Sequence, residues 1–268
     1  MKSAITVLKE QFNSFYLIIR LSLYEVRSEN RNNYLGILWE VINPMIQLAI
    51  YWFVFGFGLR GGHPRPGYIP WLFAGSSIWF FISPAVLQGS RSIYSRIRMV
   101  AKMNFPLSAI PSYVIMSKFY QHLLLLAIVI IILQFQGYPV SVYYLELPYY
   151  LVCTFVFTFS LSLITSTLAT IVRDVQNIVQ AIMRMMIYIL PVLWDPSARL
   201  HGPIELILKL NPYYYIVEGY RSALLGNMGW YLVEHLHYTI YFWAVTLIVF
   251  MIGSALHIKF RNSFVDFL

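Results

Sequence analysis

Six long apolar runs, separated by short polar or basic stretches, dominate the chain. A bilayer core is crossed by about 20 apolar residues in a helix, and a helix satisfies its own backbone hydrogen bonds in lipid. The pattern therefore predicts an all-α integral membrane protein with six transmembrane helices, in which residues 34–268 form the transmembrane domain. The predicted spans cover residues 34–59, 68–89, 107–135, 147–172, 175–194 and 236–260.

Residues 1–33 show a different pattern, in which apolar and basic side chains recur at helical spacing. On a helix drawn over residues 3–31, the large apolar residues share one side, while Arg20, Arg27 and Arg31 share another. This pattern is typical of an amphipathic helix that lies in the membrane interface. Two interpretations remain open: the helix only anchors the chain to lipid, or it also contacts a partner protein.

A basic segment, residues 91–106, separates the second and third predicted spans and contains four positive charges and no acid. Its basic and apolar positions fall on opposite sides of a helix, and the Phe-Pro pair at its end stops that helix. The segment is either a solvated cytoplasmic loop or a helix on which a cytoplasmic partner docks. The docking interpretation assigns contacts to Arg91, Arg96, Arg98, Lys102, Phe105 and Pro106.

Prolines and a glycine interrupt the stretch between the fifth and sixth spans, which holds two apolar pieces at residues 204–210 and 213–225. Each piece is too short to cross a bilayer. We therefore expect two short re-entrant helices on the outer side, where protein or water must satisfy their free backbone groups.

Composition and charge agree with a membrane location. The chain is 59% hydrophobic and 11% charged, with a mean hydropathy of +0.65, outside the range of soluble domains. The net charge of +8 does not indicate nucleic-acid binding, because the basic residues lie at the ends of apolar spans. Most Lys and Arg residues face the cytoplasm if both termini do, so we predict a multi-pass plasma-membrane protein with cytoplasmic termini.

The motifs of several catalytic classes are absent from the sequence. It contains no G-x-x-x-x-G-K-[ST], so this chain is not expected to bind ATP through a P-loop, and it also lacks H-E-x-x-H and G-x-S-x-G. The single cysteine, Cys153, excludes a cysteine-based metal site, and the acids and histidines at residues 234–237 lack zinc-ligand spacing. Ion-coupled transport normally needs several buried acids, and Glu40 is the one acid in the predicted spans. The chain therefore fits a conduit that another protein drives, and no cofactor is expected in it.

Five motifs in order carry a resemblance to a known family. They are the interfacial N-terminal helix, L-G-x-x-W with a downstream Asn-Pro (Leu35, Gly36, Trp39, Asn43, Pro44), the basic helix that ends in Phe105-Pro106, Arg173-Asp174-Val175, and Asn211-Pro212 before Glu218-Gly219-Tyr220-Arg221. In this order the chain resembles the permease subunits of ABC-type polysaccharide exporters. It is most similar to teichoic-acid translocation permeases, with O-antigen and capsule exporters close behind. It departs from that pattern just before Leu35, where Glu29, Asn30 and Asn33 stand in place of a basic-Tyr pair and a serine.

The resemblance implies a homodimer with two separate P-loop ATPase subunits, which would bind ATP and magnesium and drive a lipid-pyrophosphate-linked polymer across the membrane. It assigns the basic segment, with Arg27 and Arg31, to ATPase contact, and Arg173 and Asp174 to a cytoplasmic gate. A membrane enzyme that acts on lipid-linked sugars is the alternative from another class, and a structural or assembly subunit is a third. The absence of an acid cluster weighs against the enzyme.

Four residues are candidates for the substrate path. Trp39, Tyr51 and Phe55 share one side of the first predicted span, where aromatic faces can stack on sugar rings, although aromatic belts at membrane interfaces have the same composition. Arg184 falls near the bilayer midplane, where an arginine costs about 2.5–3.5 kcal/mol on insertion scales. It is therefore expected to face protein or water, either paired with a carbonyl or an acid of a neighbouring span or lining the path to meet phosphates.

Overall fold

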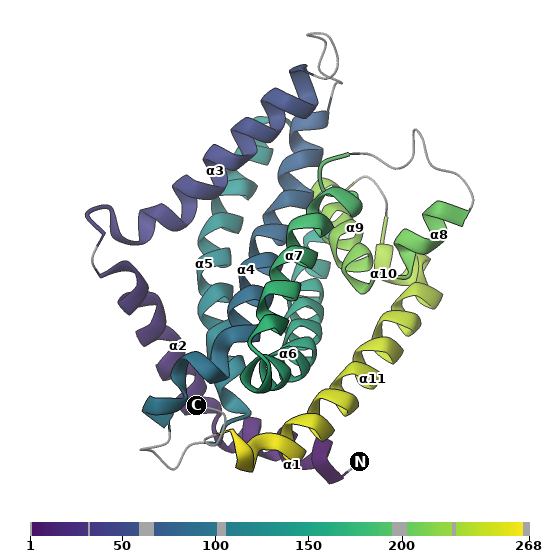
Figure 1. Cartoon of the computed structure of the whole chain (residues 1–268). Helices are drawn as coiled ribbons and strands as arrows, with labels where there is room; N and C mark the ends of the chain where they lie inside the picture. The colour runs from purple at the N-terminus through teal and green to yellow at the C-terminus, as the bar shows by residue number, and fades with distance from the viewer. Residues whose placement is uncertain are drawn as a thin grey trace.

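The computed structural model describes residues 2–31, 33–58, 67–100, 106–194, 203–226 and 229–264, with side chains except at 97–100, 203–204 and 263. These residues form helices and connecting turns, and no strand occurs among them (Figure 1). Five stretches are long and apolar enough to cross a membrane: Gly36–Phe57, Tyr68–Arg96, Ala109–Phe135, Val142–Ile171 and Leu236–Phe260. The predicted all-α membrane fold is confirmed.

The predicted fifth span is shorter than expected. Helix α7, Asp174–Ile189, has 16 residues, which at about 1.5 Å per residue do not cover a hydrocarbon core of about 30 Å. The helix ends because Leu190, which precedes Pro191, takes an extended conformation, as residues before proline prefer. The indole of Trp194 donates to the carbonyl of Tyr188 at 2.8 Å and closes the turn that follows.

Helices α4 (Tyr68–Val100), α5 (Ala109–Phe135), α6 (Leu147–Ile171) and α11 (Leu236–Phe260) form the body of the bundle (Figure 1). A 3-10 turn, η4 (Val142–Glu146), leads into α6. Small residues allow the helices to approach closely, as is usual between membrane helices. A side chain at Gly89 of α4 would collide with Ser162 of α6, and Gly253 of α11 faces the carbonyl of Ser160.

The first span lies at the edge of this bundle. It consists of a 3-10 turn, η1 (Gly36–Leu38), helix α3 (Trp39–Tyr51) and a π-helical end, η2 (Trp52–Phe57). Only 6% of its most apolar window is buried, against 67% for α4. In Figure 1 it runs obliquely along the bundle.

The basic segment does not begin as a separate helix. Helix α4 continues without a break from Tyr68 to Val100, so Arg91 and Arg96 lie on an extension of the second span, which we expected to end at residue 89. The extension is held by tertiary contacts, because Ile93 packs on Phe264 near the end of the chain. Residues 101–105 lie outside the described part of the chain.

The N-terminal segment is helical over the predicted range but forms two helices. Helix α1 (Lys2–Asn13) and helix α2 (Phe15–Asn30) meet at Ser14, and α2 then runs beside α5 toward the start of α3 (Figure 1). The carboxylate of Glu10 accepts a hydrogen bond from Arg261 at 2.9 Å. These helices are thus fastened to the bundle as well as amphipathic.

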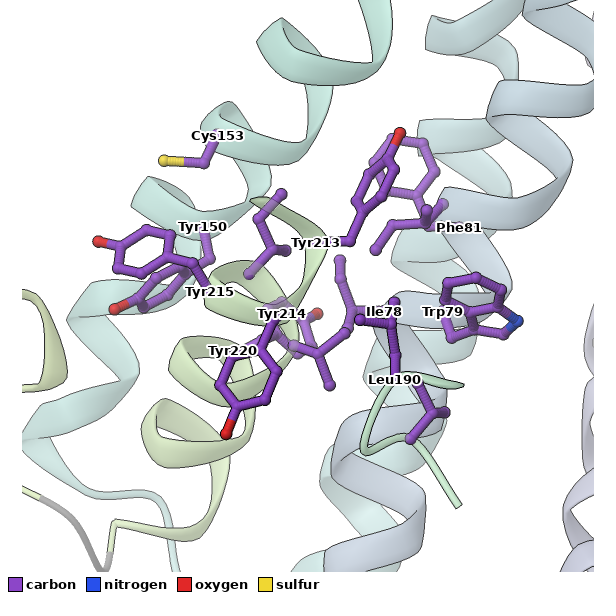
Figure 2. Close-up of a cluster of buried hydrophobic side chains, with 14 of the residues drawn as sticks. Ile78, Trp79, Phe81, Tyr150, Cys153, Leu190, Tyr213, Tyr214, Tyr215 and Tyr220 are labelled. Carbon is purple, nitrogen blue, oxygen red and sulfur yellow. The ribbon is translucent and has the colours of Figure 1, made fainter. Parts of the chain in front are cut away.

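Helices α8 (Pro203–Lys209) and α9 (Pro212–Leu225) match the two predicted short helices, and one further turn, α10 (Tyr231–Glu234), follows. The side chain of Asn211 caps α9 by accepting from the backbone N–H of Tyr213 at 3.0 Å, and Gly226, with φ +65°, ends the helix. Helix α9 is buried among tyrosines and apolar residues of its neighbours (Figure 2). Arg221, the last residue of the Glu218-Gly219-Tyr220-Arg221 motif, lies inside this core.

Candidate functional site

A cavity of about 1070 Å³ opens between α3, α4, α5 and α7, and residues at the end of α2 line one side of it. Twelve of its lining side chains are polar: Glu29, Asn30, Asn33, Glu40, Asn43, Gln47, Ser83, Gln88, Lys118, Gln121, His122 and Arg184. Polar groups at membrane depth are costly unless they face protein, water or a polar ligand. The concentration of these groups at one cavity therefore indicates a functional site.

The charges of the cavity balance. Glu29 and Glu40 are the acids, Lys118 and Arg184 are the bases, and the formal charge is zero when His122 is neutral. Such a site does not favour a bare ion of either sign. It instead offers both kinds of charge to a ligand with several polar groups.

Six carboxamide side chains account for half of the polar lining. Each amide carries a carbonyl acceptor and two N–H donors, which suits hydroxyl groups that both donate and accept. The six are Asn30, Asn33, Asn43, Gln47, Gln88 and Gln121. The cavity can therefore bind a hydroxyl-rich ligand at several points.

Arg184, one of the predicted path residues, projects from α7 into this cavity. Its Nε donates to the carbonyl of Gln180, one turn earlier on its own helix, at 3.3 Å. Among the described residues it forms no ion pair, and it is exposed. The expected pairing with a neighbouring span is not seen there, and the guanidinium remains available to a ligand.

The predicted aromatic residues divide between two places. Trp39 and Tyr51 line the cavity, together with Trp79, Phe80 and Tyr188 of other helices. Phe55 lies on the π-helical end of the first span, packs against the main apolar core and is not among the residues that line the cavity. Its place on the same side of the span as Trp39 is altered by the wider turn of the π-helix.

The residues predicted to contact an ATPase lie partly together. Arg27 and Arg31 are exposed, as is Arg91. Arg96 bonds to Glu25 of α2 and lies 5.7 Å from the ring centre of Tyr113, which joins α2 to the α4 extension. Pro106 is half-buried, the side chain of Arg98 is not described, and Lys102 and Phe105 lie outside the described residues.

Arg173 and Asp174, the predicted cytoplasmic gate, are exposed in the turn between α6 and α7. Neither is among the residues that line the cavity. Their role as a gate stays a prediction.

The polar face of α5 was missed from sequence. Lys118, Gln121 and His122 follow one another at helical spacing inside the third predicted span, and all three are buried and line the cavity. The signal was present, because ionisable and amide residues on one face of an apolar helix mark a site that faces protein or water.

Comparisons with known proteins agree with this architecture. The ABC-2 type transporter family matches residues 16–225. The chain is 25% identical over 224 residues to an O-antigen export system permease protein RfbA of Myxococcus xanthus, with 81% of this chain and 84% of that protein covered. Two proteins of the same name from Klebsiella pneumoniae are 23% and 24% identical, and cover 95% and 97% of this chain and 95% and 99% of their own lengths.

The matched range includes α2 through α9, and therefore all the helices that line the cavity. It also spans most of the 268 residues. The chain belongs to the ABC-2 type transporter family.

Proposed function

We propose that this chain is the permease subunit of an exporter that moves a lipid-linked cell-surface polysaccharide from the cytoplasm to the outside. The observation that carries the proposal is the polar cavity between α3, α4, α5 and α7. Its six amides match sugar hydroxyls, and its five aromatic side chains offer faces on which sugar rings can stack. Its volume of about 1070 Å³ lies at the upper end of the range for small-molecule sites.

The energy source in this proposal is a separate ATPase. An ABC-2 permease works with an ATPase subunit, and the sequence contains no P-loop of its own. We propose two ATPase copies that bind ATP and magnesium and contact the α4 extension and α2. Both termini would then face the cytoplasm, as the distribution of Lys and Arg supports.

We further propose that two permease copies pair. The cavity is flanked by α3 and α7, each of which exposes apolar side chains. On the first span these include Ile46 and Ile50 of α3 and Phe53 of η2, and on α7 Ile178 and Ile182. A second copy would cover these faces and enlarge the cavity.

The identity of the polymer is the more specific part of the proposal. The motifs resemble those of teichoic-acid permeases, whereas all three curated relatives compared above are named as O-antigen permeases. Those names favour an O-antigen-type polysaccharide over teichoic acid. In either case the polymer would be linked to a lipid pyrophosphate, so the cavity would contact both sugars and phosphates.

The direct test is ATP hydrolysis by the permease and its partner ATPase, reconstituted together in lipid. We expect polyprenyl-diphosphate-linked O-antigen glycan to stimulate hydrolysis several-fold more than a teichoic-acid-type lipid or polyprenyl diphosphate alone. Hydrolysis that no lipid-linked glycan stimulates would contradict the exporter. Chemical change of the glycolipid without transport would support the membrane enzyme instead.

Replacing Arg184 with glutamine should keep the fold and lower glycolipid-stimulated hydrolysis about 10-fold. The reason is that a hydrogen bond from a charged donor contributes about 1.5–3 kcal/mol, and Arg184 forms no ion pair in the described part of the chain that this change would break. Lys259→Gln, which removes an exposed charge from the end of α11, is the matched control and should leave stimulation unchanged. Normal stimulation in the Arg184 variant would leave it a structural residue.

A further inference from the structure

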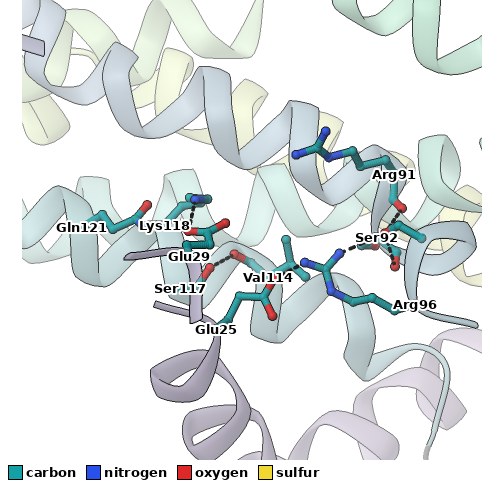
Figure 3. A network of polar contacts seen from close by, with 10 residues as sticks. Glu25, Glu29, Arg91, Ser92, Arg96, Val114, Ser117, Lys118 and Gln121 are labelled. Atoms are coloured by element: carbon teal, nitrogen blue, oxygen red, sulfur yellow. Dashed lines mark hydrogen bonds and ion pairs between the residues drawn. The ribbon is translucent and has the colours of Figure 1, made fainter. Parts of the chain in front are cut away.

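The carboxylate of Glu29, in the last turn of α2, is bound by side chains of two other helices. Lys118 Nζ of α5 lies 2.6 Å from Glu29 Oε2, and Gln121 Nε2 donates to the same oxygen at 2.9 Å. With its amide in the orientation that satisfies both of its polar groups, Gln88 of α4 donates an N–H to Glu29 Oε1 at 3.2 Å. Figure 3 shows Glu29 lying against Lys118, with Gln121 beside them. The carboxylate thus sits in a ring of three donors.

The three donors form a built site rather than a chance surface contact. Lys118 and Gln121 are each 6% exposed, and they project from one face of α5 because they are three residues apart. The carbonyl oxygen of Gln88 accepts from Lys118 at 3.0 Å, which orients the amide so that its N–H points at Glu29. The acceptor is less buried: the side chain of Glu29 is 28% exposed and comes from a helix at the edge of the bundle.

All four residues line the cavity, and the wall beside them has an unused polar atom. His122 follows Gln121 on α5 and is 3% exposed. Its Nε2 lies 2.9 Å from the hydroxyl of Tyr220, while its buried Nδ1 has no hydrogen-bond partner among the described residues. Buried polar atoms are almost always partnered, so the wall of the cavity has an unsatisfied nitrogen next to Gln121.

Resting on the proposed function, we propose that Lys118, Gln121 and Gln88 form an anion subsite for a phosphate of the cargo's lipid diphosphate. Glu29 occupies this subsite as an internal ligand when no cargo is bound. Carboxylate and phosphate oxygens accept the same charge-assisted hydrogen bonds. The incoming phosphate therefore replaces Glu29 without leaving Lys118 as an unpaired charge, which would be costly at this depth.

After a phosphate replaces Glu29, α2 would still be attached to the bundle at a second point. Glu25, one turn before Glu29, bonds to Arg96 on the α4 extension (Figure 3). Release of Glu29 therefore frees the end of α2 nearest the cavity, while Glu25 keeps the helix tied to the segment proposed to contact the ATPase. Cargo in the cavity is in this way linked to the position of α2.

Two substitutions separate this proposal from a fixed clamp between α2 and α5. Purified permease–ATPase complex in lipid nanodiscs is titrated with polyprenyl diphosphate that carries no glycan. Glu29→Gln removes the competing charge and should tighten binding about 10-fold, whereas Lys118→Gln should weaken it about 10-fold, because each changes one charge-assisted interaction. A fixed clamp predicts that both variants lose affinity together with thermal stability.

Glu25→Gln is the matched control, because it removes the other acid of the same helix face without touching the cavity. It should leave the affinity unchanged. Gln121→Met removes one donor without changing charge and should weaken binding even if Lys118→Gln does not fold. Polyprenol without phosphate should show no difference among the variants.

Glu29→Gln and Lys118→Gln shifting the affinity in the same direction would overturn the subsite. Inorganic pyrophosphate binding as tightly as the lipid form would overturn its assignment to the lipid-linked cargo, because the site would then bind a free anion equally well. Since this titration measures binding alone, it is independent of transport. Lipid-linked glycans that stimulate ATP hydrolysis by the wild type, without opposite shifts in the affinities of the two variants, would contradict the subsite and still support the exporter. If no lipid-linked glycan stimulates ATP hydrolysis, the proposed exporter function is contradicted.

Discussion

Replacing Arg221 with leucine is expected to cost about 3–5 kcal/mol of stability, because it removes one partner of a buried ion pair. Arg221 is 1% exposed and bonds to Glu218 one turn earlier on α9. Its Nη2 donates to the carbonyl of Pro191 at 2.7 Å, and its guanidinium lies 3.7 Å from the ring centre of Trp71. One side chain therefore fastens α9 to α4 and to the turn after α7.

Thermal unfolding of the purified protein in detergent measures this loss, and the yield of monodisperse protein should fall with it. Lys209→Leu is the control, because Lys209 forms the same kind of pair with Glu205 at 2.7 Å on α8, but both side chains are about one third exposed, at 34% and 32%. Exposed pairs contribute about 0–1 kcal/mol. The double variant Glu218→Met with Arg221→Leu should recover part of the stability, since no charge then remains from the pair. Equal melting temperatures for Arg221→Leu and Lys209→Leu would contradict the buried clamp.

The motif that contains Arg221 shows why its role could not be predicted from sequence. A side chain at Gly219 would collide with the ring of Tyr150 on α6, and the hydroxyl of Tyr220 lies 2.9 Å from His122 on α5. Each of these partners is about 70 or more residues away in sequence. The apolar piece at residues 213–225 predicted a short helix correctly, but it carried no information about which helices surround it.

Helix positions were predictable because the bilayer imposes a length and a polarity on each span. The errors lie where local sequence competes with tertiary contact. Helix α4 extends past residue 89 because Ile93 and Arg96 find partners elsewhere in the fold, and α7 stops at Ile189 because the residue before Pro191 leaves the helical region. A hydropathy pattern alone does not register either effect.

The candidate cavity was partly predictable. Trp39, Tyr51 and Arg184 were expected on one path from two separate spans, and all three line the cavity. The expectation rested on an aromatic side of the first span and on the cost of an unpaired arginine near the midplane. The contribution of Glu29 was not predictable, because it depends on α2 running beside α5 instead of lying apart from the bundle.

Replacing Gly253 with valine is expected to destabilise the protein by about 1–3 kcal/mol, the usual cost of overpacking a close contact. A Cβ atom at this position of α11 would lie 2.9 Å from the carbonyl oxygen of Ser160 and 3.0 Å from Cβ of Leu163, both on α6. Because a backbone oxygen cannot turn aside as the end of a side chain can, the two helices must separate. Separation removes packing that stabilises membrane helices against each other.

Ala255→Val is the matched control, since Ala255 is exposed on the same helix and the substitution introduces the same β-branched side chain. Both variants are compared with the wild type by thermal unfolding in the same detergent. We expect the melting temperature to fall for Gly253→Val and to stay near that of the wild type for Ala255→Val. An equal fall in melting temperature for both variants would mean that the β-branched side chain itself destabilises the helix. The close approach of α11 to α6 at Gly253 would then not contribute to the stability of the bundle.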